Sequence, residues 1–114
     1  MPDAAGRINL EKLHERFDND PELIRQVRDV FVRETPERLE KIQRALETGD
    51  IEGMVKLAHS LKGVCATMYA EPLREKSLEV EMAARQGDAS EVRRAAPELM
   101  SMLEDLAAYL QSLP

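Results

Sequence analysis

Apolar residues recur every three to four positions along most of the chain, the spacing that gathers them on one face of an α-helix. No segment alternates apolar and polar residues over the length of a strand. β-branched and aromatic residues, which favour strands, are scarce. The pattern therefore predicts an all-α protein. Its best-defined stripe consists of Ile51, Met54, Ala58, Leu61, Cys65 and Met68.

Capping residues divide the pattern into one short helix and four longer ones. Asp20-Pro21 supplies an N-cap and a proline suited to the first helical position. Gly49-Asp50 and Gly87-Asp88 each combine a residue that ends one helix with a cap that begins the next. Pro36 and Pro97 fall inside helices and predict kinks rather than stops. The expected helices are 8–17, 21–48, 51–68, 71–86 and 89 to about 110.

Long amphipathic helices joined by short connections favour antiparallel packing between neighbours. We therefore expect an antiparallel up-and-down four-helix bundle, with the short first helix as a lid. The length of 114 residues fits a single domain over residues 1–114. Residues 1–7 carry no helical pattern and are expected to form a flexible tail.

Composition narrows the functional classes. A net charge of −6 and only 4% aromatic residues leave neither a basic patch nor stacking platforms for nucleic acid. No apolar run approaches the roughly 20 residues that span a bilayer. One cysteine cannot form an intramolecular disulfide. We expect a cytoplasmic protein, monomeric by default, that binds neither nucleic acid nor membrane.

One histidine lies away from the apolar stripe of the 51–68 helix. At about 100° per residue, His59 falls roughly 140° from the stripe's centre and should face solvent. Gly63 and Ala66 follow it on the same exposed strip, and Val55 lies at the margin. Because a glycine inside a helix costs up to about 1 kcal/mol relative to alanine, this bare strip suggests that another molecule approaches closely.

Lys62 is three residues beyond His59, where its ammonium can reach a group attached to the imidazole. A neutral imidazole nitrogen is a competent nucleophile near pH 7. A phosphoryl group on that nitrogen carries negative charge that a lysine offsets. The residues therefore suit phosphoryl transfer, a reaction that needs mainly position and charge from the protein.

The segment Ala58-His59-Ser60-Leu61-Lys62-Gly63 resembles the His-x-Leu-Lys-Gly signature of histidine-containing phosphotransfer (HPt) domains. The similarity extends from about Ile8 to Leu110 and includes the Gly49-Asp50 turn and the Ala83–Asp88 segment. The family commonly has an Asn and a Gly further along the signature, where this chain has Thr67 and Tyr69.

The resemblance implies a four-helix bundle that carries phosphoryl groups between aspartates of response-regulator receiver domains. By this resemblance His59 accepts the phosphoryl group, Lys62 stabilises it, and Gly63 leaves room for the receiver. The partners that it implies are receiver domains and a hybrid sensor kinase. It also implies no cofactor on this chain, because the magnesium ion of such systems sits on the receiver.

Four alternatives compete with this interpretation. An autonomous enzyme is disfavoured because the chain has no glycine-rich phosphate loop and only Glu52 and Glu71, both distant, as acidic neighbours of His59. A metal site is disfavoured because Glu11 and His14 give a single Glu-x-x-His pair, whereas a di-iron bundle needs two. A receiver-docking adaptor without phosphotransfer, or the phospho-accepting domain of a larger hybrid or chemotaxis-type kinase, would have the same fold.

Overall fold

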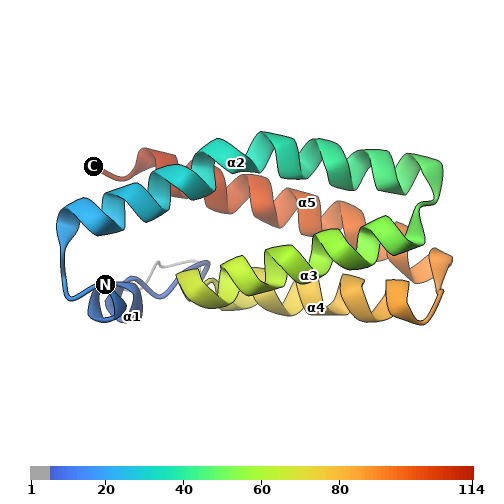
Figure 1. Cartoon of the computed structure of the whole chain (residues 1–114), viewed down its shortest axis with the longest axis horizontal. Coiled ribbons are helices and arrows are strands. Elements are labelled where there is room, and N and C mark those ends of the chain that lie inside the picture. The colour runs from blue at the N-terminus through green and yellow to red at the C-terminus, as the bar shows by residue number, and fades with distance from the viewer. Residues whose placement is uncertain (1–5) are drawn as a thin grey trace.

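The computed structural model describes residues 6–114, and all regular structure within that range is α-helical (Figure 1). This confirms the all-α prediction, and the helix boundaries closely match those expected from the caps. Pro36 and Pro97 lie inside helices and stop neither of them. The helices are α1 (Leu10–Arg16), α2 (Pro21–Thr48), α3 (Ile51–Met68), α4 (Glu71–Arg85) and α5 (Ala89–Ser112).

The predicted caps satisfy backbone groups at the helix ends. Asp20 accepts hydrogen bonds from the N–H groups of Glu22 and Leu23 and so begins α2. Asp50 and Asp88 cap α3 and α5 in the same way. At the end of α2, Gly49 takes the left-handed conformation, with φ of 67°, that reverses the chain into α3.

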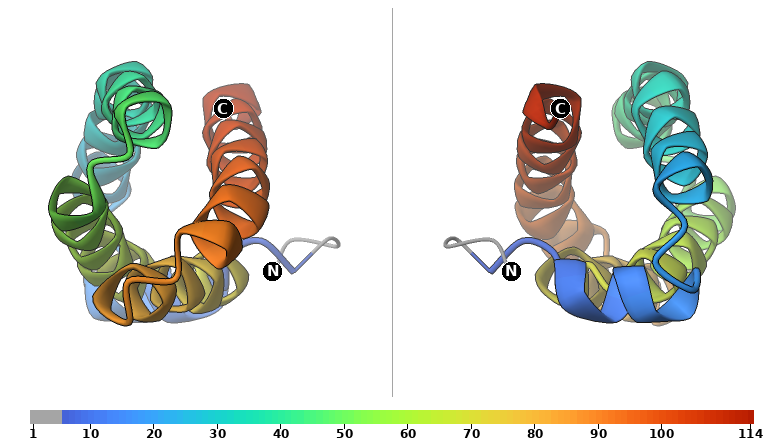
Figure 2. Two further views of the ribbon diagram at one scale, coloured as in Figure 1. Left: turned by 90° about the vertical axis from the view of Figure 1, so that its right-hand side faces the viewer. Right: turned by 90° about the vertical axis from the view of Figure 1, so that its left-hand side faces the viewer.

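The four long helices form a ring in which each packs against its two neighbours (Figure 2). In the described residues, α2 contacts α3 and α5, and α4 contacts α3 and α5. Consecutive long helices run in opposite directions (Figure 1). The antiparallel four-helix bundle is thereby confirmed, and α3 and α4 lie side by side along their lengths.

The core is built from the inward stripes of these helices. Ala58, Leu61 and Cys65 on α3 are at most 1% exposed, and Leu99 and Leu103 on α5 are fully buried. Burying each large aliphatic side chain stabilises the fold by roughly 1.5–3 kcal/mol. Because this stripe takes one side of α3, the opposite side of the helix is left to solvent.

The short helix α1 crosses one end of the bundle (Figure 2). The N–H of Asn9 donates to the carbonyl oxygen of Tyr69 at 3.0 Å, which ties the start of α1 to the end of α3. Of the expected flexible tail, residues 1–5 lie outside the described residues. Arg7 lies within them, forms an ion pair with Asp105 at 3.1 Å and stacks over the ring of Tyr109.

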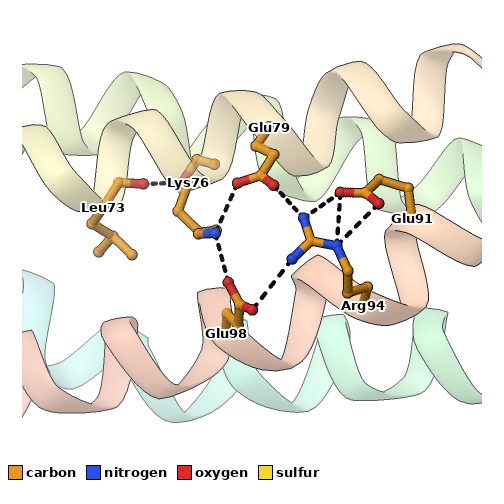
Figure 3. A network of polar contacts seen from close by, with 7 residues as sticks. Leu73, Lys76, Glu79, Glu91, Arg94 and Glu98 are labelled. Carbon is orange, nitrogen blue, oxygen red and sulfur yellow. Dashed lines mark hydrogen bonds and ion pairs between the residues drawn. The ribbon is translucent and has the colours of Figure 1, made fainter.

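A network of charged side chains joins α4 to α5 (Figure 3). Lys76 lies 2.8 Å from Glu79 and 2.7 Å from Glu98, and Arg94 lies 2.6 Å from Glu79. Arg94 also pairs with Glu91. Isolated surface ion pairs contribute little, but a network of several charges that spans two helices is more effective in fixing their alignment. The network holds one side of α4, while the other side faces α3.

Candidate functional site

His59 lies in the middle of α3 with 61% of its side chain exposed, as the helical wheel predicts. Gly63, one turn further, is exposed, and a Cβ added there would meet no atom within 4 Å. Ala66 is also exposed, and Val55 is half-buried. The structure therefore brings the predicted strip together as an open surface around one imidazole.

The imidazole contacts a buried carboxylate that comes from α4. Glu81 is only 3% exposed, and its Oε2 lies 3.0 Å from Nδ1 of His59. Its Oε1 forms an ion pair with Nζ of Lys62 at 2.7 Å. Lys62 and His59 are therefore joined through Glu81, as two residues of α3 that share one acceptor on α4.

Arg85 completes the cluster from the next turn of α4. Its Nε and Nη2 donate to Oε2 of Glu81 at 3.0 and 2.8 Å. Among the described residues Glu81 is the one charged side chain that is buried. A buried carboxylate persists only when cations and donors compensate for its lost hydration, and Lys62, Arg85 and His59 together do so.

This compensation controls the ionisation of Glu81. Burial alone would raise the pKa of its carboxyl group, but the hydrogen bonds and charges of Lys62, Arg85 and His59 outweigh burial and lower the pKa to about 2. Glu81 is therefore ionised throughout the physiological range, and it can only accept hydrogen bonds.

An ionised acceptor at Nδ1 selects one tautomer of neutral His59. The proton must reside on Nδ1, where it is donated to Glu81, and the lone pair is then left on Nε2. The same arrangement fixes the ring orientation, as second-shell carboxylates do for metal-bound histidines. The site thus presents one nucleophilic nitrogen on an exposed surface, and the carboxylate that orients its ring also holds the cations of Lys62 and Arg85.

The expectation about acidic neighbours was wrong. The wheel of α3 indicates only Glu52 and Glu71 as acidic neighbours of His59, whereas the carboxylate that contacts it is Glu81. Glu71 instead pairs with Arg74 on its own helix. The error arises because a wheel of one helix cannot show what an adjacent helix contributes. A usable signal did exist, since Glu81 follows Val80 on the inward side of α4 and lies four residues before a potential partner, Arg85.

The two departures from the family pattern occupy the end of α3. The hydroxyl of Thr67 donates to the carbonyl oxygen of Gly63 at 3.3 Å and so stays on its own helix. Tyr69 takes the left-handed conformation, with φ of 56°, that glycine adopts most easily. The helix therefore ends where a glycine would end it, at the cost of some backbone strain on Tyr69.

The remaining reactive residues do not form a second site in the part of the chain that the structure describes. Residues 6–114 contain no group of three or more His, Cys, Asp or Glu side chains placed to hold a metal ion. Cys65 is buried, and burial raises the pKa of its thiol to about 12. His14 is exposed on α1. No helix within this range is long and apolar enough to cross a membrane.

Comparisons with known proteins agree with this geometry. A family model described as Hpt domain matches residues 26–109. The crystal structure of histidine-containing phosphotransfer protein B (HptB) from Pseudomonas aeruginosa PAO1 aligns with a TM-score of 0.77 and 30% identity, over 95% of this chain and 90% of that chain. The HPT domain of an Hpt sensor hybrid histidine kinase from Shewanella aligns with a TM-score of 0.81 over 92% of this chain and 91% of that chain.

The Shewanella domain is 20% identical in sequence and bears on the fold alone. The comparison with curated proteins finds no match. The family model, in contrast, covers most of the chain and includes the whole of α3 and α4. The chain therefore belongs to the Hpt domain family of histidine phosphotransfer proteins, which act in phosphorelays.

Proposed function

We propose that His59 accepts a phosphoryl group on Nε2 from the aspartyl phosphate of a receiver domain and passes it to the aspartate of another response regulator. The single observation that carries this proposal is the Nδ1 contact with ionised Glu81, which leaves Nε2 unprotonated on an exposed surface. An exposed histidine without such a partner would be divided between two tautomers.

The transfer step needs little from this chain beyond that nucleophile. The Nε2 lone pair attacks phosphorus, the Nε2–P bond forms, and the bond from phosphorus to the aspartate oxygen breaks. The aspartate leaves as a carboxylate with the bonding electrons. The imidazole then carries positive charge, which the Glu81 carboxylate 3.0 Å from Nδ1 stabilises. Donation to the second receiver is the same step in reverse.

Lys62 and Arg85 give the site its preference for an anion. Without the imidazole, one carboxylate and two cations leave a net charge of +1 around Glu81. A phosphoryl group on Nε2 of His59 brings negative charge that the side chains of Lys62 and Arg85 can offset. We assign Lys62 to stabilising the phosphoryl group, and Gly63, Ala66 and Val55 to the close approach of the receiver.

The proposal gives this chain the part of a carrier and not of an autonomous kinase. The Mg²⁺ required for aspartate chemistry would be held by the receiver, and no cofactor is assigned to this chain. The partners would be receiver domains and a hybrid sensor kinase, encountered in the cytoplasm. The same chemistry would hold whether the chain acts as a free monomer or as part of a larger kinase.

The experiment is phosphorylation with phosphoramidate, a small donor that needs no protein partner. His14 provides an internal control, because it is exposed and its imidazole pairs with no carboxylate among residues 6–114, in contrast to His59. Intact mass and site mapping should find one fast adduct on His59, absent from His59→Ala, and at most slow labelling of His14. Equal labelling of both histidines would refute the special reactivity of His59. An adduct that no Mg²⁺-loaded receiver removes would indicate a docking adaptor instead.

A further inference from the structure

An exposed stripe of four side chains runs along the outer face of α4. Two of its members are apolar: Leu78 is 37% exposed and Met82 is 47% exposed, the highest value for a large apolar residue in residues 6–114. Glu75 and Arg85 extend the stripe at its two ends, and both are exposed. Steps of three, four and three residues separate the four positions, which keeps them on one face of the helix. This face has no partner inside the bundle.

The charged groups at the two ends of the stripe have unused capacity to form ion pairs. On the side of α4 that faces α5, the charged side chains are already held in the network of Figure 3. In contrast, Glu75 forms no ion pair or hydrogen bond with residues 6–114. Arg85 donates from Nε and Nη2 to Glu81, whereas its Nη1 donates to no residue in that range, and 53% of its side chain is exposed. A second molecule could therefore pair with both ends.

The order of the four residues makes the stripe self-complementary. Leu78 and Met82 lie two residues on either side of position 80, and Glu75 and Arg85 lie five residues on either side of it. Two copies of α4 that lie antiparallel about a two-fold axis at this position place Leu78 opposite Met82 of the other copy. They also place Glu75 opposite Arg85 of the other copy. A symmetric contact between identical chains requires self-complementarity of this kind.

The charges favour a second copy of this chain over other partners. One end of the stripe is acidic and the other is basic, so a partner surface of a single sign would be attracted at one end and repelled at the other. A second copy in the antiparallel direction matches both ends. In the parallel direction Glu75 would face Glu75 and Arg85 would face Arg85, and like charges between paired helices are destabilising.

The contact is small, and its size sets the expected affinity. α4 has 15 residues, which is about 22 Å at 1.5 Å per residue. One helix face on each copy covers less than the roughly 800 Å² per partner that is typical of specific complexes. We therefore expect a Kd of roughly 0.1–1 mM. The monomer expected from the sequence remains the main form in dilute solution.

We propose that α4 is the interface of a weak, symmetric dimer of this chain, in which the stripe from Glu75 to Arg85 packs antiparallel on the same stripe of a second copy. The inference concerns the surface of α4 and does not depend on the proposed function. The contact adjoins the transfer site, because Arg85 would join Glu81 of its own chain to Glu75 of the other copy.

The first test is sedimentation equilibrium at concentrations that span the expected Kd. Wild-type protein should dimerise reversibly. Glu75→Arg places a guanidinium opposite Arg85 and should raise the Kd at least about ten-fold. Glu47→Arg is the matched control, because it makes the same change of charge at an exposed position of α2 that also has no ion pair. Its Kd should stay within a factor of about two of wild type. An unchanged Kd for Glu75→Arg would overturn the proposal.

A mixture of two variants tests which residues face each other. Arg85→Glu alone places a carboxylate opposite Glu75 and should also weaken the dimer. Mixed in equal amounts, Glu75→Arg and Arg85→Glu restore an opposite charge at both ends, so association should recover in the mixture only. If both variants are folded by circular dichroism and the mixture does not recover, the antiparallel arrangement is wrong.

A final measurement uses the wild-type protein, so it does not depend on a variant that folds. In a mixture of ¹³C-labelled and unlabelled protein, isotope-filtered NOEs report contacts between copies and not within one chain. We expect such NOEs between the methyl groups of Leu78 and Met82. NOEs confined to another surface, or a protein that stays monomeric above the expected Kd, would refute the α4 dimer and leave the proposed function intact.

Discussion

Replacing Glu81 with glutamine removes the negative charge next to His59 and changes few atoms. The carboxylate oxygen lies 3.0 Å from Nδ1, and the positive charge that forms on the ring during transfer is centred about 4 Å away. At this separation the attraction is worth roughly 1 kcal/mol at the dielectric constant of water and roughly 4 kcal/mol at an effective value of 20.

The environment of the ring decides where in that range the effect falls. Because the His59 side chain is 61% exposed, solvent screens the attraction between the ring and the Glu81 carboxylate. We therefore take the stabilisation lost in Glu81→Gln to be roughly 1–2 kcal/mol. Such a loss in the transition state slows transfer by about five- to thirty-fold. The glutamine also no longer requires Nδ1 to carry the proton, because a side-chain amide can either donate or accept.

The assay is the rate of His59 labelling by phosphoramidate, followed by intact mass. Glu71→Gln is the matched control, because it removes the same charge from the same helix at an exposed position paired with Arg74. Glu81→Asp should recover part of the rate. ¹⁵N NMR of the imidazole should show the Nδ1–H form in the wild-type protein and a mixture of tautomers in Glu81→Gln. A folded Glu81→Gln that labels at the wild-type rate with an unchanged tautomer would refute the positioning role.

Four other outcomes follow from the same contacts. Lys62→Ala should slow transfer and shorten the phosphohistidine lifetime by about five-fold, roughly 1 kcal/mol, since one charge near the phosphoryl group is lost; a wild-type lifetime and rate would contradict this. Gly63→Glu should block receiver transfer while leaving phosphoramidate labelling intact, and thermal melting should show a gain of up to about 1 kcal/mol in stability. Because the pKa of Glu81 falls from 4.5 unfolded to about 2 folded, its contribution to stability is present above pH 4.5 and lost as pH drops toward 2. Across that window the melting temperature should therefore fall more steeply with decreasing pH for wild type than for Glu81→Gln. Equal slopes for the two proteins would count against the stabilising role of the ion cluster. Cys65, buried and with its pKa raised to about 12, should resist thiol reagents at pH 8 until denaturant is added, whereas rapid native labelling would be inconsistent with its burial.

The fold was predictable because the information that specifies it is local. The caps Asp20, Asp50 and Asp88 lie beside the residues that they cap, and the apolar stripe of α3 can be read within one helix. The exposure of His59 follows from the same stripe. Helical spacing also placed Lys62 on the correct side of α3.

The buried half of the site was not predictable in the same way. Glu81 acts on His59 across a helix interface, and the alignment of α3 with α4 depends on packing of the whole bundle. In the sequence the place of Glu81 next to Val80 on the inward side of α4 indicates burial, but no local pattern identifies His59 as its partner.

The most direct test follows one phosphoryl group from this chain to a receiver. Wild-type protein phosphorylated with phosphoramidate is mixed with a Mg²⁺-loaded receiver, and ³¹P NMR records the signals of phosphohistidine and aspartyl phosphate. The phosphohistidine signal on Nε2 of His59 should decay as the aspartyl phosphate signal rises, and His59→Ala should show neither. Phosphate found on Nδ1 of His59 would contradict the assignment of Nε2 as the nucleophile. Phosphate released as inorganic phosphate without passing through the receiver would contradict the assignment of His59 as a carrier.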